Sequence, residues 1–258
     1  MWNPAQYERF RDERKRPFFE LLARVEASSP AQVVDLGCGT GDLTLVLAER
    51  WPTARVTGVD SSEAMVAEAT RRAHPDRVRF ELADLARWTP AAPVDVLFSN
   101  AALHWLPEHP ALLSRLVSLL APGGVLAFQI PANFDAPSHR RIDEVRALPR
   151  FAATLAGVRR GQAEPLEQYE GWLAGMGLAV DAWDTTYLHV LPGEDAVLQW
   201  LLGTTLRPVL AALGPEESQA FLDTLRPLLR ADYPAAERGT PFRFTRRFVV
   251  AARREGGR

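Results

Sequence analysis

Short apolar runs alternate with helical patterns along the first half of the chain. The runs have the length of buried strands and stop at glycine, aspartate or proline, as the strands of a sheet core do. They cover residues 32–36, 54–59, 77–82, 94–99 and 125–130, with predicted helices at 43–50, 62–73 and from Leu112 to a helix end at Pro122-Gly123-Gly124. This alternation predicts an α/β fold, doubly wound around a mostly parallel sheet.

The alternation breaks after Pro131. Two polar, mostly helical segments follow at 134–178 and 192–238, and two strand-like segments at 179–191 and 242–252. The two late strands complete a predicted seven-stranded sheet. The helical segments are predicted to form a lid over the carboxyl edge of that sheet. Because no linker divides the chain, we expect one domain over residues 1–258, with a ligand-binding core at 31–131.

The N-terminal segment predicts two short helices with a break between them. Asn3 followed by Pro4 is typical of an N-cap and the first helical residue. Proline inside a helix removes a hydrogen bond and kinks the chain, so Pro17 is predicted to begin the second helix. Arg14 and Arg16 then lie in the break.

The composition excludes several classes of protein. The net charge of −2 leaves no excess of positive charge for a nucleic-acid partner. A single cysteine, Cys38, excludes an internal disulfide or a cysteine-based zinc site, and the pair Glu108 and His109 is too small to bind a metal, so none is expected. No apolar run approaches the roughly 18 residues of a membrane span, and the N-terminus has no signal sequence, so we expect a cytoplasmic protein without a membrane partner.

The segment Asp35-Leu36-Gly37-Cys38-Gly39-Thr40-Gly41 joins a predicted strand to a predicted helix. Glycines at alternate positions permit positive φ and let a ligand approach the backbone. A dinucleotide fingerprint needs glycine where this chain has Asp42, and an acid at a helix N-terminus repels a pyrophosphate. A phosphate-binding P-loop would need Gly-Lys-Ser/Thr, which is absent from this segment. The loop is therefore predicted to bind something other than a polyphosphate.

Two acids follow the next strands. Asp60 closes the second strand, where a carboxylate accepts hydrogen bonds from ribose hydroxyls in dinucleotide folds. Asp84 ends the third strand, where a carboxylate is able to accept a bond from an exocyclic amine. In series with the glycine loop, the two acids predict an adenosine that lies across the strand ends.

Together, Asp35–Gly41, Asp60 and Ala83-Asp84-Leu85 resemble the S-adenosylmethionine site of class I methyltransferases. The resemblance implies that the three glycines pass close to the methionine and the ribose, that Met65 packs on the adenine and that Asp84 faces its amine. It also implies that the N-terminal helices, residues 1–28, cover the cofactor. The predicted cofactor-binding set is Arg16, Asp35, Gly37, Gly39, Gly41, Asp60, Ser61, Met65, Asp84, Leu85 and Asn100.

Further segments are similar to the trans-aconitate methyltransferases. They are Trp2-Asn3-Pro4, Ser99–Pro107, Val180–His189, Leu206-Arg207-Pro208 and Phe248–Arg254. The resemblance spans essentially the whole chain and is least clear at 147–168; Thr40 stands where that family often has proline. It implies an S-adenosylmethionine-dependent enzyme that methylates one carboxylate of trans-aconitate, or of a close small polycarboxylate, to a monomethyl ester.

This reaction needs no general base, because a carboxylate is already ionised at neutral pH. We therefore expect no catalytic acid or base. A polycarboxylate calls for arginine, whose planar fork binds carboxylates in a bidentate manner. The predicted substrate-binding set is Arg14, His104, Trp105, Tyr187, Trp200 and Arg207, with Arg16 assigned to the methionine carboxylate.

Other interpretations stay open at the level of sequence. A methyltransferase acting on another oxygen or a nitrogen would need a base, and His104 is the best-placed residue for that role. A regulatory protein that binds S-adenosylmethionine without turnover would show the same loop and acids. A nicotinamide oxidoreductase is disfavoured by Asp42, and a nucleic-acid methyltransferase by the net charge. We expect a monomer or a weak homodimer.

Overall fold

The computed structural model describes residues 11–74 and 76–253, and the side chains of 15–74 and 76–253. The chain divides into two compact units. The sheet unit comprises Arg16–Ile130, Ala163–Thr185 and residues 247–253. The helical unit comprises Pro131–Gln162 and Thr186–Arg246, together with residues 11–15.

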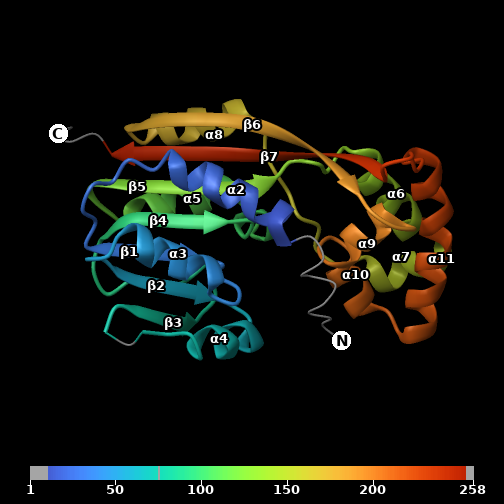
Figure 1. The fold of residues 1–258 in the computed structure, drawn as a ribbon, viewed down its shortest axis with the longest axis horizontal. Coiled ribbons are helices and arrows are strands. Elements are labelled where there is room, and N and C mark those ends of the chain that lie inside the picture. The colour runs from blue at the N-terminus through green and yellow to red at the C-terminus, as the bar shows by residue number, and fades with distance from the viewer. Residues whose placement is uncertain (1–10, 75, 254–258) are drawn as a thin grey trace. The chain divides into compact units, whose positions relative to one another are not determined.

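A seven-stranded sheet forms the centre of the sheet unit. Its strands, in chain order, are β1 (Gln32–Leu36), β2 (Arg55–Asp60), β3 (Val78–Leu82), β4 (Val94–Asn100), β5 (Leu120–Pro131), β6 (Leu178–Leu191) and β7 (Thr240–Arg253). They lie in the order β3-β2-β1-β4-β5-β7-β6, and the first five run parallel while β7 runs opposite to its neighbours (Figure 1). The predicted α/β fold and all seven predicted strands are confirmed.

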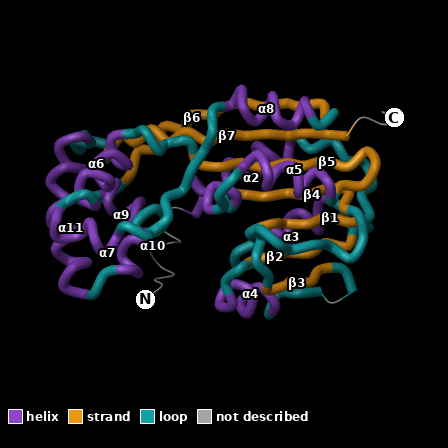
Figure 2. Tube along the Cα trace, turned by 180° about the vertical axis from the view of Figure 1, so that it is seen from behind, coloured by secondary structure: helices purple, strands orange, loops and turns teal. Residues whose placement is uncertain are grey.

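Helices pack on this sheet because the parallel strands are apolar on both faces. In β1 and β4, for example, Val33, Leu36 and Phe98 are buried. The helices of the sheet unit are α3 (Asp42–Arg50), α4 (Glu63–Thr70), α5 (His109–Ser118) and α8 (Leu166–Gly175), together with the part of α2 (Arg11–Ala23) that begins at Arg16 (Figure 2). A short 3-10 turn lies at Leu103–Trp105. Among the described residues, no helix combines the length and the apolar character that a bilayer span requires.

The predicted break before Pro17 is wrong, because helix α2 runs through this residue. Proline in a helix interior costs about 3 kcal/mol. Phe18 and Leu21, one turn apart on the same helix, are both 0% exposed. Full burial of two such side chains is worth about 1.5–3 kcal/mol each, which outweighs the cost of the proline.

The predicted end of the fifth helix is also wrong. Helix α5 ends at Ser118, and the residues from Leu120 onward already belong to β5. Val94 pairs with Leu120 while Val96 pairs with Val125, so the register shifts between them. Gly123, with φ of 73°, supplies the left-handed residue that this irregularity requires.

The helical unit has its own hydrophobic core. Its helices are α6 (Pro137–Arg146), α7 (Pro149–Leu155), α9 (Ala196–Leu202), α10 (Arg207–Ala212) and α11 (Pro215–Asp232), and parts of β6 and β7 belong to it. Phe151 and Phe221 meet edge to face at 5.2 Å, and Trp200 packs beside Phe242. Residues 163–178, which the sequence analysis includes in the first lid segment, lie instead in the sheet unit.

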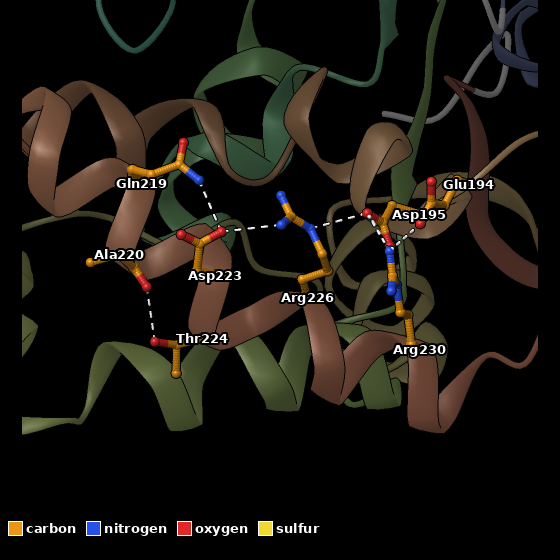
Figure 3. A network of polar contacts seen from close by, with 8 residues as sticks. All are labelled: Glu194, Asp195, Gln219, Ala220, Asp223, Thr224, Arg226 and Arg230. Atoms are coloured by element: carbon orange, nitrogen blue, oxygen red, sulfur yellow. Dashed lines mark hydrogen bonds and ion pairs between the residues drawn. The ribbon is translucent and has the colours of Figure 1, made fainter.

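An ion-pair network joins α11 to the start of α9. Asp195 precedes α9 in a left-handed conformation, with φ of 52°. Its carboxylate accepts hydrogen bonds from Arg230 at 2.6 and 3.1 Å and pairs with Arg226 at 3.0 Å (Figure 3). Because Asp195 is largely shielded from solvent, the two arginines stabilise a backbone conformation that a non-glycine residue otherwise disfavours.

Candidate active site

The candidate site lies at the carboxyl edge of the sheet unit. The strand order places β1 between β2 and β4, so the residues that follow these three strands meet at one edge. They are the loop Gly37–Gly41 after β1, Asp60 at the end of β2 and Asn100 at the end of β4. In open α/β sheets this edge is where ligands bind.

The three glycines of the loop are needed for two different reasons. All three have positive φ, at 81°, 56° and 79° for Gly37, Gly39 and Gly41. A Cβ on Gly37 would lie 2.2 Å from the Cβ of Ala102, and one on Gly41 would lie 2.6 Å from the ring of Phe80. A Cβ on Gly39 would meet nothing within 4 Å. Gly37 and Gly41 therefore allow close packing, whereas Gly39 keeps an open surface that a ligand is able to approach.

Asp60 holds the glycine loop in place. One carboxylate oxygen accepts the N–H of Gly39 at 2.9 Å, and the other accepts the N–H of Ser62 at 2.9 Å. The main-chain N–H groups of Gly37 and Cys38 donate to the carbonyl of Val59 in the same strand. Each carboxylate oxygen of the half-buried Asp60 keeps a further lone pair. The residue is therefore fixed in orientation and still able to accept hydroxyl donors.

Asp35 supports the loop from inside the protein. It is 2% exposed, and its carboxylate accepts the Thr44 hydroxyl at 2.6 Å. Burial raises its pKa from 3.8 to about 6, with the Thr44 hydrogen bond opposing the rise and the charge of Asp60 adding to it. Asp35 therefore joins the start of the loop to α3 through Thr44, and its predicted role in cofactor binding stays a prediction.

Asp42 has a partner that sequence reasoning missed. The Arg72 guanidinium lies 2.8 Å from its carboxylate and also donates to the carbonyl of Thr40 at 3.0 Å. The predicted repulsion of a pyrophosphate by Asp42 is therefore weaker than the isolated residue implies. The two residues lie 30 positions apart in the sequence, so no local pattern predicts this ion pair.

The other predicted adenosine contacts differ in exposure. The Asp84 side chain is 60% exposed, and its carboxylate accepts the N–H of Ala86 at 2.9 Å. Ser61 is exposed and Met65 is half-buried, whereas the side chain of Leu85 is buried in the core. Asp84, Ser61 and Met65 are thus accessible to a ligand. The side chain of Leu85 is largely inaccessible to one.

A buried amide fixes Asn100. Gln129 in β5 is 1% exposed, and its Nε2 donates to the Asn100 Oδ1 at 2.6 Å. The next residue, Ala101, has a positive φ of 56°, and its N–H donates to the Gln129 carbonyl. Sequence reasoning missed Gln129, although a polar residue inside the apolar run 125–130 was a signal. This hydrogen bond uses the Asn100 carbonyl oxygen, so the donors of its amide nitrogen are not needed for it.

The segment after β4 is anchored through His109. Its Nε2 lies 3.1 Å from the Leu103 carbonyl, and its Nδ1 lies 2.6 Å from the Tyr169 hydroxyl. Because a carbonyl only accepts, Nε2 carries the proton and the tyrosine donates to Nδ1. Burial lowers the pKa of His109, which keeps the ring neutral. His104 is buried and Trp105 partly exposed in this anchored segment, with ring centroids 4.6 Å apart.

The predicted arginines on α2 are only partly described. Arg16 is exposed on this helix, in the sheet unit. Arg14 belongs to the same helix, but its side chain lies outside the described residues. The predicted helix break, which was the reason for choosing both residues, is absent. Their predicted binding roles now rest only on their position on α2.

Three predicted substrate residues lie in the helical unit. Arg207 is exposed at the first position of α10, and Tyr187 is buried with its ring stacked on His189 at 6.0 Å. Trp200 is 1% exposed and packs between His189, Phe242 and Phe244. The Trp200 side chain is part of the core of the helical unit, so the structure gives no support to its predicted contact with substrate. The unit also buries a cation that was not predicted, Arg246, whose guanidinium lies 4.7 Å from the Phe244 ring.

Comparisons with known proteins agree with this geometry. A family model described as a methyltransferase domain matches residues 33–124. The trans-aconitate 2-methyltransferase of Streptomyces coelicolor is 49% identical and covers 99% of this chain and 88% of that protein. The protein of the same name from Methylobacterium nodulans is 46% identical, over 98% of each chain.

Solved structures share the fold at low identity. The YcgJ protein of Bacillus subtilis has a TM-score of 0.58 at 16% identity and covers 93% of this chain and 98% of its own. Phosphoethanolamine N-methyltransferase 2 of Haemonchus contortus, solved with S-adenosyl-L-methionine, has a TM-score of 0.54 at 18% identity and covers 91% of this chain and 51% of its own.

The seven-stranded sheet and the glycine loop braced by an aspartate define a class I methyltransferase. The identity of 46–49% to relatives over nearly the full chain shows which family within this class the chain belongs to. The chain belongs to the trans-aconitate 2-methyltransferase family.

Proposed function

We propose that this enzyme uses S-adenosylmethionine to methylate one carboxylate of trans-aconitate, or of a close small polycarboxylate, to a monomethyl ester. The observation that carries the proposal is the cradle at the carboxyl edge of the sheet. There Gly39 leaves open space beside a carboxylate that is oriented by two backbone N–H groups. The small-molecule substrate and the ester product follow from membership of the family.

The residues present fit S-adenosylmethionine. A side chain on Gly39 would fill the space through which the ligand is predicted to approach the backbone, and Asp60 offers lone pairs to the ribose hydroxyls. The exposed Asp84 is available to the adenine amine, with Met65 and Ser61 beside the same strand ends. When bound, this cofactor supplies a methyl group that is already activated by the positive sulfonium.

The protein's part in the reaction is positioning. A carboxylate acceptor is ionised at neutral pH, so its alignment and desolvation dominate the barrier. The amide nitrogen of Asn100, held by Gln129, and the anchored segment with His104 and Trp105 are proposed to orient the reacting groups. Arg207, Arg14 and Tyr187 are proposed to bind the substrate, the two arginines through its carboxylates, and Arg16 to bind the methionine carboxylate. We further propose a cytoplasmic monomer or weak homodimer without a nucleic-acid partner.

The test is transfer of a tritiated methyl group from S-adenosylmethionine to a panel of di- and tricarboxylic acids. Transfer to trans-aconitate, with base-labile product as expected for an ester, supports the proposal. Amines and phenols serve as controls in the same panel. Transfer to one of these and to no carboxylic acid would instead favour a methyltransferase for another acceptor. Binding of the cofactor without transfer to any acceptor would favour a regulatory protein.

A further inference from the structure

A cavity of about 390 Å³ lies at the opposite end of the strands from the candidate active site. It is lined by the first residues of β1 and β2, Gln32 and Arg55, whereas the glycine loop and Asp60 lie at the last residues of the same strands. Its volume falls within the range of sites for small molecules. A ligand in this cavity would therefore not compete with one at the carboxyl edge.

The cavity owes its existence to the connection between β3 and β4. The strand order separates β3 from β4 by β2 and β1, so this connection has to cross both of them. Parallel strands are usually joined by a helix, but residues 83–93 contain none. Trp88 and the residues 90–92 line the cavity in its place.

The floor of the cavity is a strand face that carries arginine. Arg55 and Thr57 alternate on β2. Arg79 lies on the neighbouring β3, in register with Thr57, and Arg77 directly precedes this strand. β2 is an interior strand, and interior parallel strands are normally apolar on both faces, so Arg55 is the unusual residue, whereas β3 is the edge strand of the sheet. The lining residues include three arginines and one carboxylate, Asp76, and so carry two net positive charges.

The three arginines are held to different degrees. Arg77 donates to the carbonyls of Ala48 and Pro52 at 3.1 and 2.6 Å, which leaves its positive charge unopposed by a carboxylate. Arg79 donates to the Thr57 hydroxyl at 3.1 Å and lies 3.2 Å from Glu81. Among the described residues, Arg55 has no side-chain hydrogen bond or ion pair. Arg77 and Arg79 are thus held in place, and Arg55 is available for a ligand. This arrangement indicates that the cavity binds an anion.

We propose that this cavity is a second binding site, for a small oxyanion that carries two or more negative charges, such as a phosphate or a polycarboxylate. Arginine binds both kinds of oxyanion with the same bidentate geometry. The proposal rests on the cavity and its charges and is independent of the proposed methyl transfer.

The test is calorimetric titration of the full chain with inorganic phosphate and, separately, with citrate, at constant ionic strength. We expect saturable binding to one site with a dissociation constant in the millimolar range or below for at least one of the two anions. The double variant R55Q/R79Q should weaken that binding roughly tenfold or more. The matched control R238Q removes an exposed arginine of the helical unit and should change nothing.

The affinity for S-adenosylhomocysteine, measured in the same variants, shows whether the sheet unit has kept its structure, and it should stay unchanged. Binding of phosphate alone or of citrate alone assigns the class of oxyanion. If neither anion binds saturably, or if R55Q/R79Q binds as wild type does, the proposal is wrong. An equal loss of anion binding in R238Q would also contradict the proposal, because the effect would then come from the net charge of the protein and not from the cavity.

Discussion

Asp35, Asp60 and Asp84 share one side-chain chemistry, and their surroundings give them different tasks. Asp35 is buried against Thr44, Asp60 is half-buried with two backbone N–H donors, and Asp84 is mostly exposed. The sequence predicts all three as ligands because each lies in or just after a strand. Burial, which the sequence does not show at this level, separates Asp35 from the two acids whose side chains remain accessible.

The raised pKa of Asp35 makes stability depend on pH. Its pKa is about 6 in the folded protein, against 3.8 for an exposed aspartate, so the folded state binds the proton more tightly. Stability from this group is therefore complete below about pH 4 and is lost as the pH rises through 6. We expect wild type to lose about 1 kcal/mol of unfolding free energy between pH 5 and pH 7 relative to D35N.

The measurement is urea unfolding of wild type and D35N at both pH values. Asparagine keeps an acceptor for the Thr44 hydroxyl, so the variant isolates the charge. Equal pH dependence in the two proteins would show that Asp35 keeps an ordinary pKa.

Asp60 should control cofactor affinity. D60A removes the acceptor that orients the loop and the lone pairs proposed for the ribose, so S-adenosylhomocysteine binding should weaken by about 1.5–3 kcal/mol, the range for hydrogen bonds to a charged group. Calorimetry measures the affinity. D181N, which changes an exposed aspartate paired only with Arg24 among the described residues, serves as the control and should bind as wild type does. Unchanged binding by D60A would remove Asp60 from the cofactor site.

Arg207 should affect the substrate and not the cofactor. R207A is expected to lower kcat/KM for trans-aconitate roughly tenfold or more, because a desolvated carboxylate loses its cation. R207K keeps the charge without the planar fork and should be intermediate. Steady-state kinetics with R238A as control measure the effect. A parallel loss of S-adenosylhomocysteine affinity would indicate a structural role for Arg207 at the start of α10.

At the level of elements, different glycines of the loop serve ligand approach and packing. Gly39 leaves space for a ligand, whereas Gly41 allows close packing against Phe80. G39A places a methyl group in open space at a φ of 56°, so the protein should fold with modest strain and bind S-adenosylhomocysteine more weakly. G41A drives a methyl group into the ring of Phe80 at 2.6 Å, so it should lower the melting temperature more than G39A does. Thermal unfolding and calorimetry on both variants measure this contrast. Equal losses of stability would contradict the separate roles.

The elements also show where sequence reasoning ends. The strands are predictable because each is a short apolar run bounded by a turn signal, as at Gln32–Leu36. The course of α2 through Pro17 is not, because the burial of Phe18 and Leu21 that stabilises it depends on the rest of the fold. The same holds for Gln129 and Arg72, whose partners lie 29 and 30 residues away in sequence.

At the scale of the whole molecule, the described residues form two large clusters of buried hydrophobic side chains. One gathers buried residues of the sheet unit, including Leu36, Leu116 and Phe128, and the other gathers Phe151, Phe221 and further residues of the helical unit. The sequence predicts a single domain with helical lid segments, because no linker marks a boundary. The division is invisible in sequence since the chain passes from one unit to the other several times, twice within the continuous strands β6 and β7.

Two cores should give two thermal transitions, because each unit loses its own buried apolar surface. Phe98 in the sheet unit and Phe221 in the helical unit are both fully buried, so F98L and F221L form a matched pair. Each substitution should destabilise its own unit by about 0.5–3 kcal/mol and lower one transition only. S-adenosylhomocysteine should raise the transition that F98L lowers, because a ligand stabilises the state that binds it and the glycine loop belongs to the sheet unit.

Differential scanning calorimetry of wild type and both variants, with and without this ligand, makes the comparison. A single transition that F98L and F221L lower equally would show that the continuous strands β6 and β7 couple the two cores into one cooperative unit. Two transitions that both rise with S-adenosylhomocysteine would instead mean that the ligand also binds residues of the helical unit, and its contacts would then have to be sought there as well as at the strand ends.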